Sequence, residues 1–319
     1  MNIEMNESVP GPGNPKTGII LLAHGAPNSV DDIPLYLKNI RGGTESSPEV
    51  IQLIQDRYEA IGGSSPLLEI TASQANALQT LLHQAGSDFK VYVGMRNWSP
   101  YIRDVVRQCV QDKVERIVTL CLAPQYSKWS TERYLASFQE ALEKCSANNI
   151  ETRFISSWCD HPGLIDAFTE RYHAAINDLD AIGKREIHIL FTAHSIPEES
   201  LDDGDPYEEE YRKTVQGIVD KVHPAHWYRA YQSQGMIPVP WLGPTVEQVM
   251  DRIAEMGGKH VLIVPVGFVC DHIEILYDID IGFKEYAERK NLALSRTESL
   301  NASPLFIQAL AEVVWAHLV

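Results

Sequence analysis

The stretch ILFTAHSIP, residues 189–197, places a histidine where an apolar, strand-like run ends, and almost the same phrase, IILLAHGAP, occurs at residues 19–27. A proline three residues after each histidine stops the strand. The repetition is weak internal symmetry, and it indicates two similar α/β lobes packed around a cleft. Because open α/β sheets bind ligands beyond the carboxyl ends of their strands, His24 and His194 are candidate site residues.

The rest of the chain alternates short apolar runs with longer amphipathic stretches, which is the pattern of parallel sheets covered by helices on both faces. The strand-like runs lie near residues 18–23, 89–95, 116–122, 151–157, 186–192, 227–232 and 260–268. The helix-like segments lie near residues 49–61, 68–85, 100–113, 130–145, 163–179, 206–222, 245–256, 272–290 and 304–317. The sequence therefore predicts the α/β class.

Three parts of the chain follow from this pattern. Residues 1–16 are polar and rich in proline and glycine, and without the apolar core of a signal peptide they are expected to form a flexible tail. We place the first lobe at residues 17–155 and the second at 156–319, with the last helix free to cross back to the first lobe. The chain is long enough for two domains of ordinary size.

Composition excludes several classes of protein. The 27 basic and 43 acidic side chains give a net charge of −16, which argues against a nucleic-acid partner. The five cysteines are widely spaced without a CxxC pair, so neither a zinc site nor an iron–sulfur cluster is indicated, and buried thiols in a reducing compartment are expected. No apolar run approaches 18 residues, so no transmembrane segment is expected. A cytoplasmic location follows from these expectations.

The segment GFVCDHIEILYDID, residues 267–280, follows the most apolar strand and carries several carboxylates. Asp271, Glu274 and Asp278 are spaced to share one helical face, whereas Asp280 joins that face only if the helix widens to π geometry. One such acid is more often a solvated residue that complements the helix dipole. Three that emerge directly from a buried strand, together with His194, outline a path for a divalent cation or for protons.

The first lobe contributes cationic and aromatic residues in IRGG (40–43), DRYEAIGGSSPL (56–67) and GMRNWSPYI (94–102). Arginine suits substrate carboxylates and aromatic rings suit a flat apolar ligand, although a single arginine is more often part of a surface ion pair. The GGSS stretch lacks the spacing of nucleotide-binding loops. No nucleophile elbow or HExxH motif supports a hydrolase.

Taken together, RYEAIGGSSP, AHSIP, YQSQGMIPVPWLGP and PVGFVCDHIEILYDID resemble the ferrochelatase family, which inserts ferrous iron into a porphyrin. The resemblance runs from about Gly18 to the C-terminus, with the motifs in the family's order, and in combination these motifs are highly specific. It implies two Rossmann-like lobes, each a parallel four-stranded sheet flanked by helices, with a porphyrin cleft between them. It also implies a lyase of haem biosynthesis.

By this resemblance His194 matches the catalytic histidine and Glu274 the catalytic glutamate, both acting as metal ligands. Two pyrrole N–H protons must leave while Fe²⁺ arrives, so a neutral imidazole and a carboxylate are suitable ligands and bases. Bending of the macrocycle would expose its nitrogen lone pairs. Asp278, one turn beyond Glu274, is then a relay for the cation or the protons.

The short segment DDIPLYLKNIRGG, residues 31–43, resembles the Bacillus-like branch, which uses coproporphyrin III. By that match His24 replaces a tyrosine that ligates iron from the other face, and axial ligation by His24 is expected to be feasible. Gly282 stands where that branch has a glutamate, so an outer metal site near Asp278 is expected to be weak or absent. The matched porphyrin-binding residues are His24, Arg41, Arg57, Tyr58, Ser65, Arg96 and Tyr134.

Several alternatives stay open at this point. The C-terminal stretch RTESLNASPLFIQALAEVV is more like the branch that uses protoporphyrin IX. A cobalt chelatase for sirohydrochlorin and a haem-binding carrier are less favoured. The expected partners are a porphyrin, Fe²⁺ and a transient protein partner from the haem pathway. No resident cofactor is expected, and no [2Fe-2S] cluster.

Overall fold

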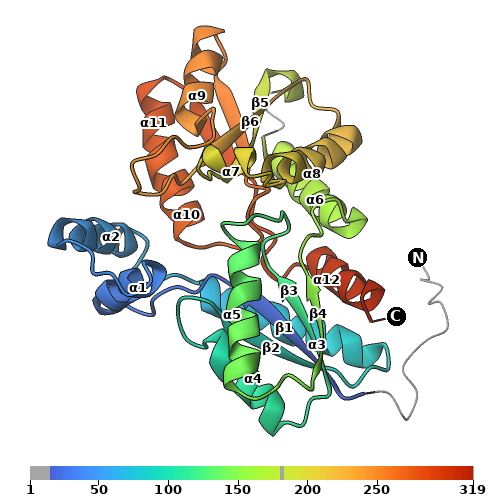
Figure 1. Ribbon diagram of the computed structural model, residues 1–319. Coiled ribbons are helices and arrows are strands. Elements are labelled where there is room, and N and C mark those ends of the chain that lie inside the picture. Colours follow the sequence, from blue (N-terminus) through green and yellow to red (C-terminus); the bar gives the residue numbers. More distant parts are fainter. Residues whose placement is uncertain (1–14, 180–182, 319) are drawn as a thin grey trace.

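The computed structural model describes residues 15–179 and 183–318, and nearly all of the predicted tail lies outside these residues. The first lobe contains a four-stranded sheet in the order β2-β1-β3-β4, in which every neighbouring pair is parallel (Figure 1). Its central strands are continuous apolar runs that are buried on both faces, as parallel sheets require. The strands are β1 (Thr17–Ala23), β2 (Lys90–Met95), β3 (Arg116–Cys121) and β4 (Glu151–Ile155).

The second lobe repeats this topology with a parallel sheet in the order β6-β5-β7-β8. The first strand of each half, β1 or β5, is thus central in its own sheet, as the repeated phrase predicts. The predicted fold class, two lobes with four parallel strands each, is confirmed. The strands are β5 (Ile187–His194), β6 (His226–Gln232), β7 (His260–Val264) and β8 (Ala293–Arg296).

Helices cover both sheets, and two of them, α1 and α2, form an arm that projects from the first lobe beside the second (Figure 1). In the first lobe the helical segments are η1 (Val30–Asp32), α1 (Ile33–Ile40), α2 (Pro48–Ala60), α3 (Leu67–Gln84), α4 (Ile102–Gln111) and α5 (Thr131–Lys144). Those that follow are α6 (Pro162–Asp178), η3 (Lys184–Glu186), α7 (Glu199–Asp202), α8 (Tyr207–Val222), α9 (Val246–Glu255), α10 (Ile273–Leu276), η4 (Asp278–Phe283), α11 (Lys284–Arg289) and α12 (Pro304–Ala316).

Outside the segments predicted from the sequence pattern lie η1, α1, α7 and β8. Helix α1 was absent from the predicted segments, and β8 has only four residues, ALSR, too short to show an apolar run. The long helix predicted for residues 272–290 is three segments, because a π-helical turn, η4, separates α10 from α11. In this turn the amide of Gly282 donates to the carbonyl of Tyr277, five residues earlier.

The last helix, α12, connects the lobes, because it packs against both α3 and α6 (Figure 1). The ring of Phe306 lies 6.0 Å from that of Trp158, and Gln74 on α3 donates to the carbonyl of Asn301 just before α12. A Cβ at Gly163 would lie 2.8 Å from the Cβ of Ala309, so glycine there permits the close approach of α6 and α12. One buried apolar cluster thereby runs from the first sheet to the second.

The loop after β3 also joins the lobes through buried polar contacts. Gln125 donates to Thr214 on α8 and to the carbonyl of Val266, which follows β7. Asp205 accepts hydrogen bonds from the hydroxyl of Ser127 and the amide of Lys128. These contacts fix the two sheets relative to one another, so residues after their strands can form one site. No helix in the described residues is long and apolar enough to span a membrane.

Candidate active site

The centre of the site is a pair formed by His194, the last residue of β5, and Glu274 in the first turn of α10. His194 Nε2 lies 3.6 Å from Glu274 Oε1, and its Nδ1 contacts the carbonyl of Ser195. The Ser195 contact orients the ring so that Nε2 faces the carboxylate. The structure therefore brings the two predicted catalytic residues together. Both side chains are about one-third exposed, so a ligand can reach them.

A second imidazole, His272, approaches the other oxygen of the same carboxylate. His272 Nε2 lies 3.5 Å from Glu274 Oε2, and its Nδ1 contacts the carbonyl of Cys270 at 3.0 Å. The ring of Phe268 lies 4.9 Å from that of His272 and 6.5 Å from that of His194, at the edge of the pair. His272 was missed as a site residue at the sequence level, although it stands inside the DHIE motif that identified Glu274.

Mutual attraction sets the charges of the central pair. Burial raises the pKa of the Glu274 carboxyl, but the neighbouring His194 and His272 outweigh this and hold it well below its usual range. Burial lowers the pKa of His194, but the Glu274 carboxylate, its hydrogen bond and Asp278 raise it above the ordinary value. The pair is therefore an ionised carboxylate beside an imidazole that is a stronger base than usual in its neutral form.

Asp278, the first residue of η4, lies next along the acidic segment. It accepts a hydrogen bond from Ser233 at 2.5 Å and lies 3.9 Å from the Nη1 atom of Arg57 on α2. Burial, followed by repulsion from Glu274, raises the pKa of its carboxyl group. Arg57 also lies over the ring of Tyr277 at 5.1 Å, so a first-lobe cation meets the second-lobe acidic segment here.

The two other carboxylates of the segment point elsewhere, which corrects the predicted line of acids. Asp271 precedes the helix and accepts hydrogen bonds from Ser299 and Asn301. Asp280 lies in the π turn but forms a two-point ion pair with Arg296 instead of joining the Glu274 face. The π geometry is present, but the arginine and not the turn decides where Asp280 points, and so Glu274 and Asp278 alone form the acidic line.

His24 follows β1, and part of its ring is open to solvent while Asn97 and Tyr36 lie against other parts of it. The amide of Asn97 donates to its Nε2 at 3.1 Å, and the ring meets that of Tyr36 edge-on at 6.3 Å. Loss of hydration within the surrounding protein, with smaller repulsions from Arg96 and His194, lowers the pKa of His24 to about 4 despite attraction by Glu274. At neutral pH this imidazole is uncharged.

The other predicted porphyrin-binding residues divide into two groups. Tyr58 and Tyr134 are buried, and the Glu274 charge contributes to raising the pKa of each phenol, so both lie near the central pair. Arg41 instead is exposed at the end of α1 and donates to Ser46, and Ser65 is half-buried and accepts from the amide of Leu67. No contact joins Arg41 or Ser65 to the pair of His194 and Glu274 among the described residues.

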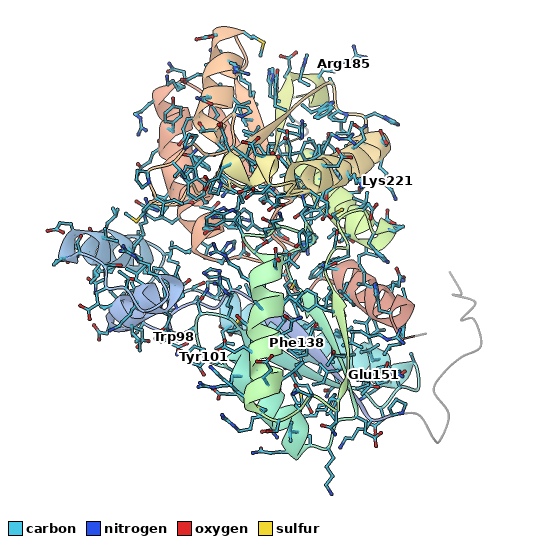
Figure 2. All side chains as sticks on the ribbon, viewed as in Figure 1. Trp98, Tyr101, Phe138, Glu151, Arg185 and Lys221 are labelled. Carbon is cyan, nitrogen blue, oxygen red and sulfur yellow. The ribbon has the colours of Figure 1, made fainter. Side chains whose placement is uncertain are left out.

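Arg96, just after β2, has a guanidinium without a hydrogen-bond or ion-pair partner among the described residues. It is half-buried, and burial lowers its pKa, which means that its charge is poorly solvated. Further along the chain, Trp98 packs edge-on against Tyr36, and Tyr101 accepts from Asn39; Figure 2 labels both Trp98 and Tyr101. An unpaired cation beside aromatic rings suits an anionic, flat ligand.

No three histidine, cysteine, aspartate or glutamate side chains in the described residues converge closely enough to hold a metal ion. Cys109, Cys121, Cys159 and Cys270 are buried and Cys145 is half-buried, all as free thiols. Whether the protein carries a [2Fe-2S] cluster is not tested by this arrangement, and its absence stays a prediction.

Solved structures with this two-lobed architecture define the fold as that of the chelatases. The sirohydrochlorin chelatase SirB of Bacillus subtilis subspecies spizizenii, solved in complex with cobalt, matches with a TM-score of 0.56 at 9% identity over 95% of each chain. CbiX, the terminal enzyme of sirohaem biosynthesis in denitrifying bacteria, matches with a TM-score of 0.57 at 12% identity over 95% of this chain and all of its own.

Sequence comparison shows which family of chelatases the chain belongs to. The ferrochelatase family model matches residues 16–318. A ferrochelatase of Acidobacterium capsulatum is 41% identical over 95% of both chains, and a coproporphyrin III ferrochelatase of a Geobacillus species is 36% identical over 94% of this chain and 97% of its own. The chain belongs to the ferrochelatase family. It is accordingly a lyase of haem biosynthesis that acts on a porphyrin and a metal ion.

Proposed function

We propose that the protein inserts Fe²⁺ into coproporphyrin III, with His194 and Glu274 as metal ligands and proton acceptors. The observation that carries the proposal is the contact between His194 Nε2 and Glu274 Oε1 at the carboxyl edge of the second sheet. The cationic and aromatic edge of the first lobe, which includes Arg96 and Tyr134, supplies the complementary surface for a flat, acidic ring.

The raised pKa of His194 suits proton removal. Insertion replaces two pyrrole N–H protons with one Fe²⁺, so the porphyrin loses two protons as four nitrogens bind the ion. Neutral His194 accepts one of them, because its raised pKa makes it a stronger base than an ordinary imidazole. Glu274 is ionised before the metal arrives and attracts the cation. As Fe²⁺ approaches, its charge weakens the hold of Glu274 on the His194 proton, so His194 passes that proton by way of the Glu274 carboxylate to Asp278 and solvent. His194 is then neutral again and accepts the second pyrrole proton.

Asp278 is proposed as the relay between the pair and solvent. Its pKa is raised, so it exchanges protons more readily near neutral pH than an ordinary aspartate does. The hydrogen bond from Ser233 keeps its carboxylate beside Glu274, and Arg57 balances part of the charge. Gly282 supplies no further carboxylate on this line, which leaves Asp278 as the outer acid.

Two features favour coproporphyrin III over protoporphyrin IX. Four propionates need more cationic and hydroxyl donors than two do, and the proposed binding set offers Arg41, Arg57, Arg96, Ser65, Tyr58 and Tyr134. The coproporphyrin III ferrochelatases among the relatives are 35–36% identical over 94–95% of the chain. The more similar relatives bear only the name ferrochelatase, so the choice of porphyrin needs a direct assay.

The assay compares the two porphyrins side by side under anaerobic conditions with Fe²⁺. We expect a higher kcat/KM with coproporphyrin III, and faster turnover of protoporphyrin IX would contradict the substrate proposal. His194→Ala and Glu274→Ala are each expected to abolish nearly all insertion while porphyrin affinity stays within about tenfold, or about 1.4 kcal/mol. Wild-type rates in both variants would show that these residues are not the catalytic pair.

A further inference from the structure

Arg296, at the end of β8, contacts both ends of the acidic segment. Its Nε and Nη2 atoms donate to Asp280 Oδ1 and Oδ2 at 2.7 and 2.9 Å, which is a bidentate pair. Its Nη2 atom lies 3.2 Å from Asp271 Oδ1, and its Nη1 atom donates to the carbonyl of Thr297. The side chain is 17% exposed, so these charges are largely removed from bulk water.

One of the two aspartates, Asp271, is also held by other residues. Asp271 accepts from Ser299 and from Asn301 at 2.8 Å each, and its amide donates back to Asn301 at 2.9 Å. Asp280 is the third residue of the π turn. A π turn is intrinsically unfavourable and persists where side-chain contacts favour it.

We propose that Arg296 is a positioning residue that fixes both ends of segment 271–280 and thereby places Glu274 against His194 and Asp278 toward Ser233. The two aspartates bracket the residues proposed to handle the metal and the protons. A guanidinium can hold both carboxylates at once because its donors are arranged in a rigid fork, whereas an ammonium cannot reproduce that geometry. The inference rests on the proposed roles of Glu274 and Asp278.

A matched arginine on the other lobe supplies the control. Arg116 at the start of β3 lies 3.0 Å from Glu151 at the start of β4, and its side chain is 19% exposed. This pair sits at the amino end of the first sheet, on the opposite side from His24, and Figure 2 labels Glu151. Arg116→Met therefore removes an ion pair of similar burial without touching the site.

The experiment measures kcat for Fe²⁺ insertion, porphyrin affinity by fluorescence quenching, and thermal unfolding in Arg296→Met, Arg296→Lys and Arg116→Met. Arg296→Met is expected to lower kcat at least tenfold while porphyrin Kd stays within threefold. Arg116→Met is expected to keep kcat within twofold. Arg296→Lys should recover more of the thermal stability than of the rate, because it restores charge but not the fork.

The inference is overturned if Arg296→Met keeps kcat within twofold of wild type, or if Arg116→Met loses as much rate as Arg296→Met. If Arg296→Met does not fold, Asp280→Asn decides, because it keeps the side-chain size and one acceptor. A threefold or greater fall in its kcat supports the inference, and a smaller fall overturns it.

A crystal structure of a folded Arg296 variant separates this inference from the proposed function. The inference predicts that the separation of Glu274 Oε1 from His194 Nε2 grows beyond the 3.6 Å of the wild type, whatever the reaction. An unchanged separation overturns the positioning role. Failure of the wild type to insert iron would overturn the proposed function alone.

Discussion

His24 and His194 follow equivalent strands in nearly identical phrases, yet their surroundings give them opposite properties. His24 accepts a hydrogen bond from the neutral Asn97, and loss of hydration lowers its pKa to about 4. His194 faces the Glu274 carboxylate, and its pKa rises above the ordinary value. The strand-end phrase thus fixes where an imidazole stands, while residues from elsewhere in the chain decide whether it can serve as a base.

The largest expected difference between the two is in the rate of metal insertion. His194→Gln should lower kcat/KM by about 10³-fold, or about 4 kcal/mol of transition-state stabilisation, because an amide cannot accept the pyrrole proton. His24→Gln should lower it by less than about tenfold, since a neutral ring there is at most a ligand or a contact. Anaerobic Fe²⁺ insertion assays on both variants measure this, and equal losses would remove the distinction between the lobes.

The next difference concerns the residue after each histidine. Gly25 has φ +90, and a Cβ there would lie 2.9 Å from the amide nitrogen of Trp98, so Gly25→Ser should cost about 3 kcal/mol of unfolding free energy. Ser195 instead donates its buried hydroxyl to the carbonyl of Leu242 at 2.8 Å. Ser195→Gly should therefore cost less, about 1–2 kcal/mol.

Urea denaturation of the two variants ranks these losses. A Gly25→Ser protein as stable as wild type would mean that the first phrase can adopt the conformation of the second. The two phrases would then be interchangeable, contrary to the geometry of the two strand ends.

A smaller effect is expected in the pH profile. The Asp278 charge helps to raise the His194 pKa, so Asp278→Asn should lower that pKa. The base must be unprotonated to act, and the acidic limb of kcat/KM should therefore shift to lower pH, by less than about one unit. The pH profile can be measured with Zn²⁺ in place of Fe²⁺, because Zn²⁺ is not oxidised by air. Asp104→Asn on α4 is the control, and a shift to higher pH in Asp278→Asn would contradict the assignment.

The smallest expected effect concerns ligation by His24. Its Nε2 accepts a hydrogen bond from Asn97, so Nε2 can bind iron only if the Asn97 amide turns away. The other ring nitrogen that could bind iron is Nδ1. If His24 ligates iron, the absorption spectrum of bound iron porphyrin should change in His24→Ala. An unchanged spectrum would rule ligation out and leave His24 as a contact residue.

The sequence alone predicted the α/β class, and the repeated phrase located both histidines at strand ends. Local patterns suffice for these features because burial and periodicity are written in neighbouring residues. The spacing of the acids singled out Glu274, its catalytic role came from the family motif, and the structure places it beside His194. The β8 strand could not be predicted, because its four residues, ALSR, are too few and too mixed to show an alternation of apolar and polar side chains.

The orientation of the acids could not be predicted because it depends on distant partners. Spacing alone put Asp271 on the face of Glu274, but Ser299 and Asn301, about thirty residues away, hold it elsewhere. Arg296 does the same for Asp280. His272 could have been found, because it is two residues from Glu274 in a motif that had already been singled out.

The most direct test of the central claim is an NMR pH titration of the two imidazoles in the substrate-free protein, assigned with His24→Gln and His194→Gln. His24 is expected to stay neutral until the pH falls to about 4, while His194 is expected to gain its proton at a higher pH than an ordinary imidazole does. Titration of His194 at lower pH than His24 would contradict the central claim, because the second lobe would then lack the stronger base.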